Sequence, residues 1–119
     1  MIQNFEEITK PLTEEEKKLV PILISGFKSK TKDNPITGSE IVDAINRKKD
    51  SLGLSKNFSE PRLRKLTNFI RSAGIMPVIA TSNGYYVSYD KEEIALQIQS
   101  LEQRAAAILE SANGLKKYL

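Results

Sequence analysis

The stretch SEPRLRKLTNFIRSAG, residues 59–74, carries side chains that could recognise DNA on one short segment. Arg64, Asn68 and Arg71 recur there at helical spacing. Arginine pairs with guanine edges in the major groove, and asparagine pairs with adenine edges. We therefore predict Arg64, Asn68 and Arg71 as base contacts. The alternative is that these residues form an ordinary solvated helix face.

Other basic and polar residues are candidates for contacts to DNA phosphates. Residues 36–89 hold eight Lys and Arg against four acids, although the whole chain has a net charge of only +3. A local excess of positive charge suits a surface that binds a polyanion. We predict phosphate contacts by Arg47, Lys48, Lys49, Lys56, Ser59, Arg62, Lys65 and Asn83.

The sequence lacks two of the residue types that enzymes use most often in catalysis. The chain contains no cysteine and no histidine, which removes thiol nucleophiles, the commonest general base and most transition-metal ligands. We therefore expect no enzyme, no catalytic residue, no metal ion, no cofactor and no small-molecule substrate. The first 18 residues lack the pattern of a secretion signal, and apolar runs are short, so we expect a cytoplasmic protein that does not bind membranes.

The first two helices have clear start signals. Thr13 with Glu16, and Thr37 with Glu40, match the capping box, so helices are expected from residue 14 and from Gly38. Pro21 leaves two alternatives for the first helix: it kinks near Val20, or the main helix starts with Pro21 in its first turn. The segment 46–58 that follows the second helix reads as a polar connection.

A third helix is expected over residues 60–73, between a Ser59 cap and Gly74. Its predicted core side comprises Leu63, Leu66, Phe69, Ile70 and Ala73. Two short strands, 78–80 and 85–87, flank Asn83-Gly84, a pair typical of hairpin turns in which both central residues have positive φ. The order of three helices and a hairpin is that of a winged helix, with residues 60–73 as the recognition helix and 77–88 as the wing.

Four blocks of the chain carry a family resemblance: LTEEEKKLVPILISGFKSK, NPITGSEIVDAIN, PRLRKLTNFIRSAG and VIATSNGYYVS. The chain resembles a group of small winged-helix proteins encoded by bacteriophages and prophages. Arg62, Arg64, Ile70, Arg71 and Gly84-Tyr85-Tyr86 fall where that resemblance places them. It implies a winged-helix fold and a phage origin, and hence the cytoplasm of a bacterial host cell. DNA binding follows from it only by analogy of fold.

The last segment shows a heptad pattern typical of coiled coils. Apolar residues recur at alternating spacings of four and three, and we predict a dimer seam at Ile94, Ile98, Leu101, Ala105, Ile108 and Ala112. Packing of this helix within its own chain is the equal alternative to a homodimer. The expected organisation is an N-terminal arm (1–12), a winged-helix domain (13–89) and a C-terminal heptad-patterned helix (90–119).

Two functions follow from this mainly α fold with a small β-hairpin, a winged helix-turn-helix followed by a long C-terminal helix. The first is a dimeric module that binds double-stranded DNA, with residues 60–73 in the major groove. The second is a non-enzymatic interaction module that docks a phage or host protein through the winged helix and the last helix.

Overall fold

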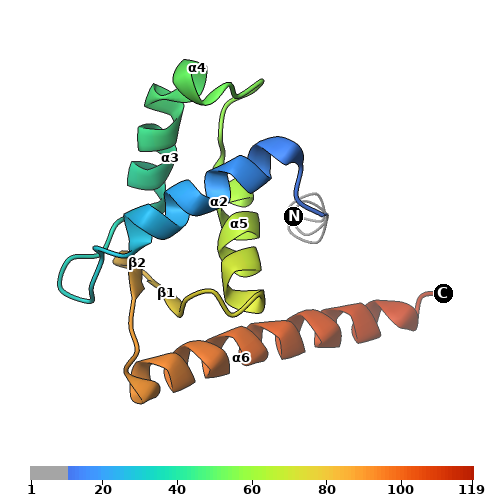
Figure 1. Ribbon diagram of the computed structural model, residues 1–119. Coiled ribbons are helices and arrows are strands. Elements are labelled where there is room, and N and C mark those ends of the chain that lie inside the picture. Colours follow the sequence, from blue (N-terminus) through green and yellow to red (C-terminus); the bar gives the residue numbers. More distant parts are fainter. Residues whose placement is uncertain (1–10) are drawn as a thin grey trace. The chain divides into compact units, whose positions relative to one another are not determined.

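The computed structural model describes residues 11–119. The predicted N-terminal arm, residues 1–12, therefore lies almost wholly outside the described residues. The chain divides into two compact units, Met1–Ser88 and Tyr89–Leu119, and each is described by itself. The first unit contains four helices and a hairpin within the described residues, and the second is one long helix (Figure 1).

Helix α2 (Glu14–Phe27) begins at the predicted capping box. Thr13 Oγ1 accepts a hydrogen bond from Glu16 N, and Glu16 Oε1 accepts one from Thr13 N. The helix runs without interruption through Pro21, so the alternative of a separate helix starting there is wrong. Pro21 is exposed, on the side of the helix away from the core residues Leu19 and Leu23. Ile22 is exposed as well.

Helix α3 (Gly38–Arg47) has the predicted capping box of Thr37 and Glu40. The connection after it is more ordered than predicted, because it contains the short helix α4 (Lys49–Leu52), which ends at Gly53 with a positive φ of 68°. Helix α5 (Glu60–Ser72) follows, capped by Ser59. The apolar side chains of α2, α3 and α5 form one core with Leu54, Phe58, Met76 and Val78.

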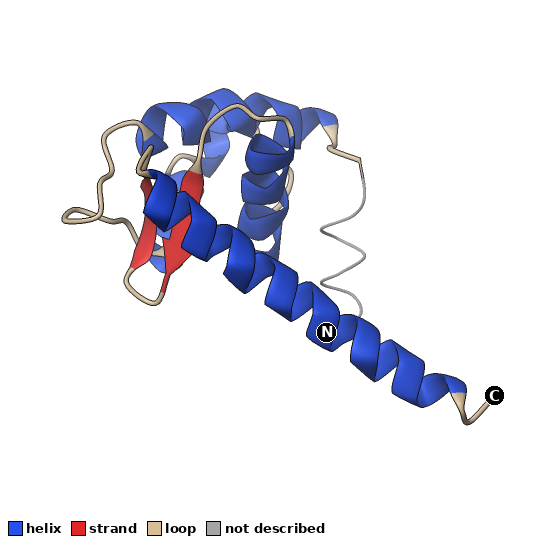
Figure 2. Cartoon of the chain, turned by 90° about the horizontal axis from the view of Figure 1, so that it is seen from below, coloured by secondary structure: helices blue, strands red, loops and turns tan. Residues whose placement is uncertain are grey.

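Strands β1 (Val78–Thr81) and β2 (Gly84–Val87) form an antiparallel hairpin, drawn in red in Figure 2. The segment before α3 extends this sheet, because Ile36 exchanges two hydrogen bonds with Tyr85, of 2.9 and 2.7 Å. The predicted turn is corrected: Thr81 pairs with Gly84, so the loop residues are Ser82 and Asn83. Among the described residues only glycines have positive φ, so Asn83 does not.

Gly84 is required by a close backbone approach rather than by the turn itself. Its φ is +127°, and a Cβ there would lie 2.6 Å from the carbonyl oxygen of Ile36. No side chain fits at that distance. The glycine therefore allows the hairpin to pair with the segment before α3.

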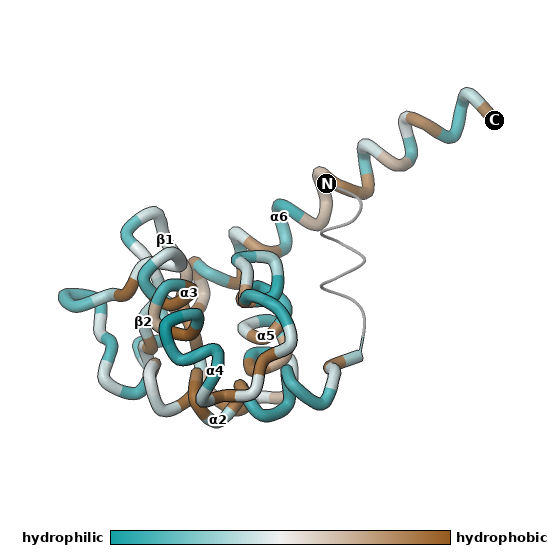
Figure 3. Tube along the Cα trace, turned by 90° about the horizontal axis from the view of Figure 1, so that it is seen from above, coloured by the Kyte–Doolittle hydropathy of each residue, from teal (hydrophilic) through white to brown (hydrophobic). Residues whose placement is uncertain are grey.

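Helix α6 (Lys91–Lys116) matches the predicted long last helix. The Asp90 carboxylate accepts a hydrogen bond from Glu92 N at its start. Hydrophobic segments, brown in Figure 3, recur along its length between hydrophilic ones. These elements confirm a mainly helical chain with a two-stranded hairpin and a long C-terminal helix.

Candidate nucleic-acid interface

Hydrogen bonds from α2 and α3 fix the position of α5 in the first unit. The side chain of Asn46 on α3 makes two hydrogen bonds with the backbone of Phe58: Asn46 Nδ2 donates to Phe58 O (3.1 Å), and Phe58 N donates to Asn46 Oδ1 (2.7 Å). The Glu15 carboxylate of α2 accepts from Ser55 N at 3.2 Å. The loop that leads into α5 is therefore held from two other helices.

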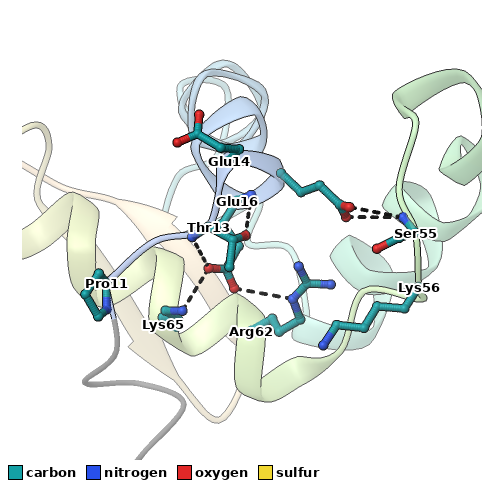
Figure 4. A pocket seen from close by; sticks show the side chains of 9 residues that line it. Pro11, Thr13, Glu14, Glu16, Ser55, Lys56, Arg62 and Lys65 are labelled. Atoms are coloured by element: carbon teal, nitrogen blue, oxygen red, sulfur yellow. Dashed lines mark hydrogen bonds and ion pairs between the residues drawn. The ribbon is translucent and has the colours of Figure 1, made fainter.

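A buried charge network joins α5 to α2 (Figure 4). The Glu16 carboxylate binds Lys65 Nζ at 2.8 Å through one oxygen and Arg62 Nε at 3.4 Å through the other. Glu16 is 1% exposed, and Arg62 and Lys65 are each 4% exposed. A buried charge is tolerated when it is paired and hydrogen-bonded. Two cations of the predicted recognition helix are thus used inside the protein.

The ionisation of Glu16 reflects opposing effects. Burial raises the pKa of this carboxyl, but hydrogen bonds from Lys65 and from Thr13 N, with the charge of Lys65 and a further bond from Arg62, lower it by more. The net pKa lies below 4.5. Glu16 is therefore a carboxylate at neutral pH, and it stands against two positive charges.

This network corrects two sequence predictions. Arg62 and Lys65 were expected at DNA phosphates, but their charged groups point inward to Glu16. Glu16 itself was recognised only as a capping residue. The one sequence signal for this buried pairing was that Arg62 and Lys65 lie beside the apolar stripe of α5. In the structure Thr67, another polar residue of α5, is also buried. The actual partner of Arg62 and Lys65 lies 46 and 49 residues earlier in the chain.

Arg71 also has a partner within the protein. Its Nε donates a hydrogen bond of 2.8 Å to the backbone carbonyl of Val78, so the side chain ties the end of α5 to β1. Arg71 is half-buried, and its guanidinium is bonded to the hairpin, so its predicted base contact stays a prediction.

Among the exposed polar residues of α5, the three that follow Glu60 form a narrow row, which we call the outer stripe: Arg64, Asn68 and Ser72. They are spaced four residues apart and are all exposed, so they lie on one side of the helix. Within residues 11–119, the side chains of Arg64 and Asn68 make no hydrogen bond or ion pair. Two of the three predicted base contacts therefore share one exposed face.

The hydroxyl of Tyr85 lies in the positive electrostatic field of Arg64 and Arg71. Burial raises the pKa of its hydroxyl, while the nearby charges of Arg71 and Arg64 act in the opposite direction and Glu60 adds to the rise. The tyrosine ring packs near Phe27, with ring centroids 6.0 Å apart. Tyr85 is thus a partly buried neighbour of Arg64 rather than a separate stacking surface.

A groove of about 550 Å³ lies between α2 and α5 next to the outer stripe. Its lining includes Lys17, Asn68, Phe69 and Ser72. Phe69 was predicted to be core but is 39% exposed. Lys17, which pairs with Glu14 at 3.2 Å, is a cation beside the stripe that the sequence did not single out.

Most of the basic loop residues that were predicted to contact phosphates are exposed. Arg47, Lys48 and Lys56 are exposed, and Lys49 is half-buried. Arg47 Nε donates to the carbonyl of Asp43 within α3. Of the two polar candidates, Ser59 caps α5 through Arg62 N, and Asn83 is exposed at the hairpin loop.

Acidic residues do not neutralise these cations through direct pairs. In the described part of the chain, no ion pair includes Asp43, Asp50 or Glu60. The Glu60 carboxylate instead lies against the start of α3, where a Cβ on Gly38 would approach Glu60 Oε1 to 2.8 Å. A helix N-terminus favours negative charge there.

The predicted seam on α6 is largely exposed. Ile94 is half-buried, and the other five seam residues are exposed. Residues 11–119 contain no cluster of acidic side chains suited to a metal ion. They also contain no helix of the length and apolar character needed to cross a bilayer. Comparison of the chain with protein-family models, with curated proteins and with solved structures found no match.

Proposed function

We propose that the first unit is a winged helix-turn-helix of phage origin that binds double-stranded DNA in the cytoplasm of a bacterial host. The order α2, α3, α5, β1 and β2 supports this proposal. The pairing of Ile36 with Tyr85 supports it too, because it fastens the hairpin to the helices. In this assignment α5 is the recognition helix and β1–β2 is the wing. The family resemblance is consistent with it.

The outer stripe carries the proposal. Arg64 and Asn68 are exposed one turn apart on α5. The other basic side chains of this helix are bonded to Glu16 or to the backbone of Val78. In the major groove, Arg64 would pair with guanine O6 and N7, and Asn68 with adenine N6 and N7. Lys17, Arg47, Lys48 and Lys56 would contact phosphates, which position the protein without reading sequence.

The Glu16 network contributes by holding α5 in place. A recognition helix must present its side chains in a fixed position, and buried ion pairs attach α5 to α2 at two successive turns. The same network removes two cations from the surface. We therefore expect fewer phosphate contacts, and a shallower salt dependence, than the basic residues of α5 alone suggest.

The test begins with selection of bound sequences from a random duplex pool, followed by titration of the enriched duplex. Arg64→Ala should lower its affinity by about 1–3 kcal/mol, the usual worth of a bidentate base contact, with an unchanged melting temperature. The matched control is Arg64→Lys, which keeps the charge but not the paired donors. It should lose sequence discrimination and keep the dependence of affinity on salt.

Lys48→Ala tests the phosphate contacts separately. It should weaken binding to all duplexes alike and flatten the plot of log affinity against log salt by about 0.9. Absence of duplex binding at low salt would overturn the proposal. It would favour the second candidate, a protein-docking module, which the exposed Phe69 and the exposed apolar residues of α6 support.

A further inference from the structure

Helix α6 exposes an apolar row that nothing in its own unit covers. Ile98 is 50% exposed, Leu101 38% and Ile108 47%. These residues occupy core positions of one heptad pattern together with Ala105, Ala112 and Leu115. A continuous row of this kind over a helix about 40 Å long is typical of a coiled-coil surface.

The distribution of large and small residues along this row identifies what fits it. In a parallel pair of α6 helices each residue faces its own copy, so Ala105 and Ala112 would form two thin layers. Coiled-coil cores pack best when large side chains face small ones. In an antiparallel pair, Leu101 faces Ala112 of the second copy and Ala105 faces Ile108. Ile98 then faces Leu115, so neither alanine faces another alanine.

Flanking charges select among antiparallel registers. If Leu101 faced Ala105 instead, Glu102 would lie next to Glu102 of the second copy and Arg104 next to Arg104. Like charges at these flanking positions destabilise a pair. With Leu101 against Ala112, Glu102 faces Leu109 and Arg104 faces Ser111, so no like charges meet.

We propose that two copies of the chain associate through α6, antiparallel, with Leu101 of each copy packed against Ala112 of the other. This arrangement gives six core layers from Ile98 to Leu115. It separates the two Lys91 ends by about 45 Å along the helix pair, at 1.5 Å per residue. The first units are thus attached at opposite ends of the pair. The association requires no DNA and stands independently of the proposed function.

Sedimentation of the full chain without DNA tests the association, with wild type expected as a dimer at tens of micromolar. Leu101→Glu should raise the dimer dissociation constant roughly a hundredfold or more, because each dimer loses two buried leucines. Leu96→Glu is the matched control, since Leu96 is 65% exposed but lies off the row; it should remain dimeric. A monomeric wild type, or equal dissociation by both variants, overturns the proposal.

Disulfide trapping tests the orientation without disturbing the core by charge. The chain has no cysteine, so introduced thiols report only the designed contacts. A disulfide requires Cβ atoms about 3.8 Å apart. Ile98→Cys mixed with a mass-tagged Leu115→Cys should give a cross-linked heterodimer, and Ile98→Cys alone should give none. Cross-linking of Ile98→Cys with itself shows a parallel pair and overturns the antiparallel arrangement.

Discussion

Helices α5 and α6 both carry apolar residues at helical spacing, but only α5 buries them within its own unit. Leu63, Leu66 and Ile70 of α5 are almost completely buried. In α6, by contrast, Leu101 and Ile108 remain well exposed. The difference teaches that apolar periodicity identifies a helix that needs a partner without saying whether that partner is in the same chain.

Charged residues also differ in burial between the two helices. Helix α5 buries Arg62 and Lys65 because α2 supplies Glu16, whereas Glu102 and Arg104 of α6 are exposed. A basic helix face is therefore not equivalent to a DNA-binding face. Of the three predicted base contacts on α5, Arg64 and Asn68 of the outer stripe are exposed.

The largest test of this comparison removes the anion that α5 depends on. Glu16→Gln leaves Arg62 and Lys65 buried without a counter-charge. Breaking a buried ion pair in this way typically costs about 3–5 kcal/mol of unfolding free energy, measured by urea unfolding of the first unit. The matched control is Glu14→Gln, which removes an exposed carboxylate paired with Lys17. Exposed pairs contribute little, so the control should unfold like wild type.

Equal unfolding free energies for Glu16→Gln and wild type would contradict the network. They would mean that Arg62 and Lys65 can turn outward without cost. In that case their predicted phosphate contacts would be restored, and the salt dependence of DNA binding would be correspondingly steeper.

A second test compares glycines in the two regions. Gly84→Ala in the first unit places a methyl group 2.6 Å from Ile36 O at a positive φ, and backbone strain of this kind costs about 1–3 kcal/mol. Gly114→Ala in α6 meets nothing within 4 Å and should raise helix content, since alanine favours helix over glycine by about 1 kcal/mol. Urea unfolding and circular dichroism measure the two effects. Destabilisation by both substitutions would remove the distinction between the regions.

The sequence predicted the elements of this fold well because their signals are local. The two capping boxes and the Ser59 cap place the starts of α2, α3 and α5 where the structure has them. The hairpin strands were predicted to within one residue. The loop of the hairpin was not, because Gly84 is needed for its approach to Ile36, a contact between segments 48 residues apart.

The candidate site was predicted only in part, and for the same reason. Arg64 and Asn68 are exposed as expected, but Arg62, Lys65 and Arg71 are committed to Glu16 and to Val78. The sequence prediction assigned Lys65 and Arg71 to DNA contacts from their residue type and their place on the helix. Which long cation turns inward depends on an acceptor supplied by another element, and that acceptor is not visible in the pattern of α5.

The smallest expected effect is the pH dependence of the same network. The pKa of Glu16 is lowered below 4.5 in the folded protein, so the folded state binds fewer protons than the unfolded state near that pH. The stability that Glu16 contributes is complete above 4.5 and is lost as pH falls through the lower folded pKa. Glu15 and Glu40 also have lowered pKa values, so part of the acid loss is independent of Glu16. Unfolding free energy measured from pH 6 downward, over about three pH units, should therefore fall less steeply in Glu16→Gln than in wild type. Identical slopes would show that Glu16 is not held as a carboxylate by α5, even if its removal destabilises the fold.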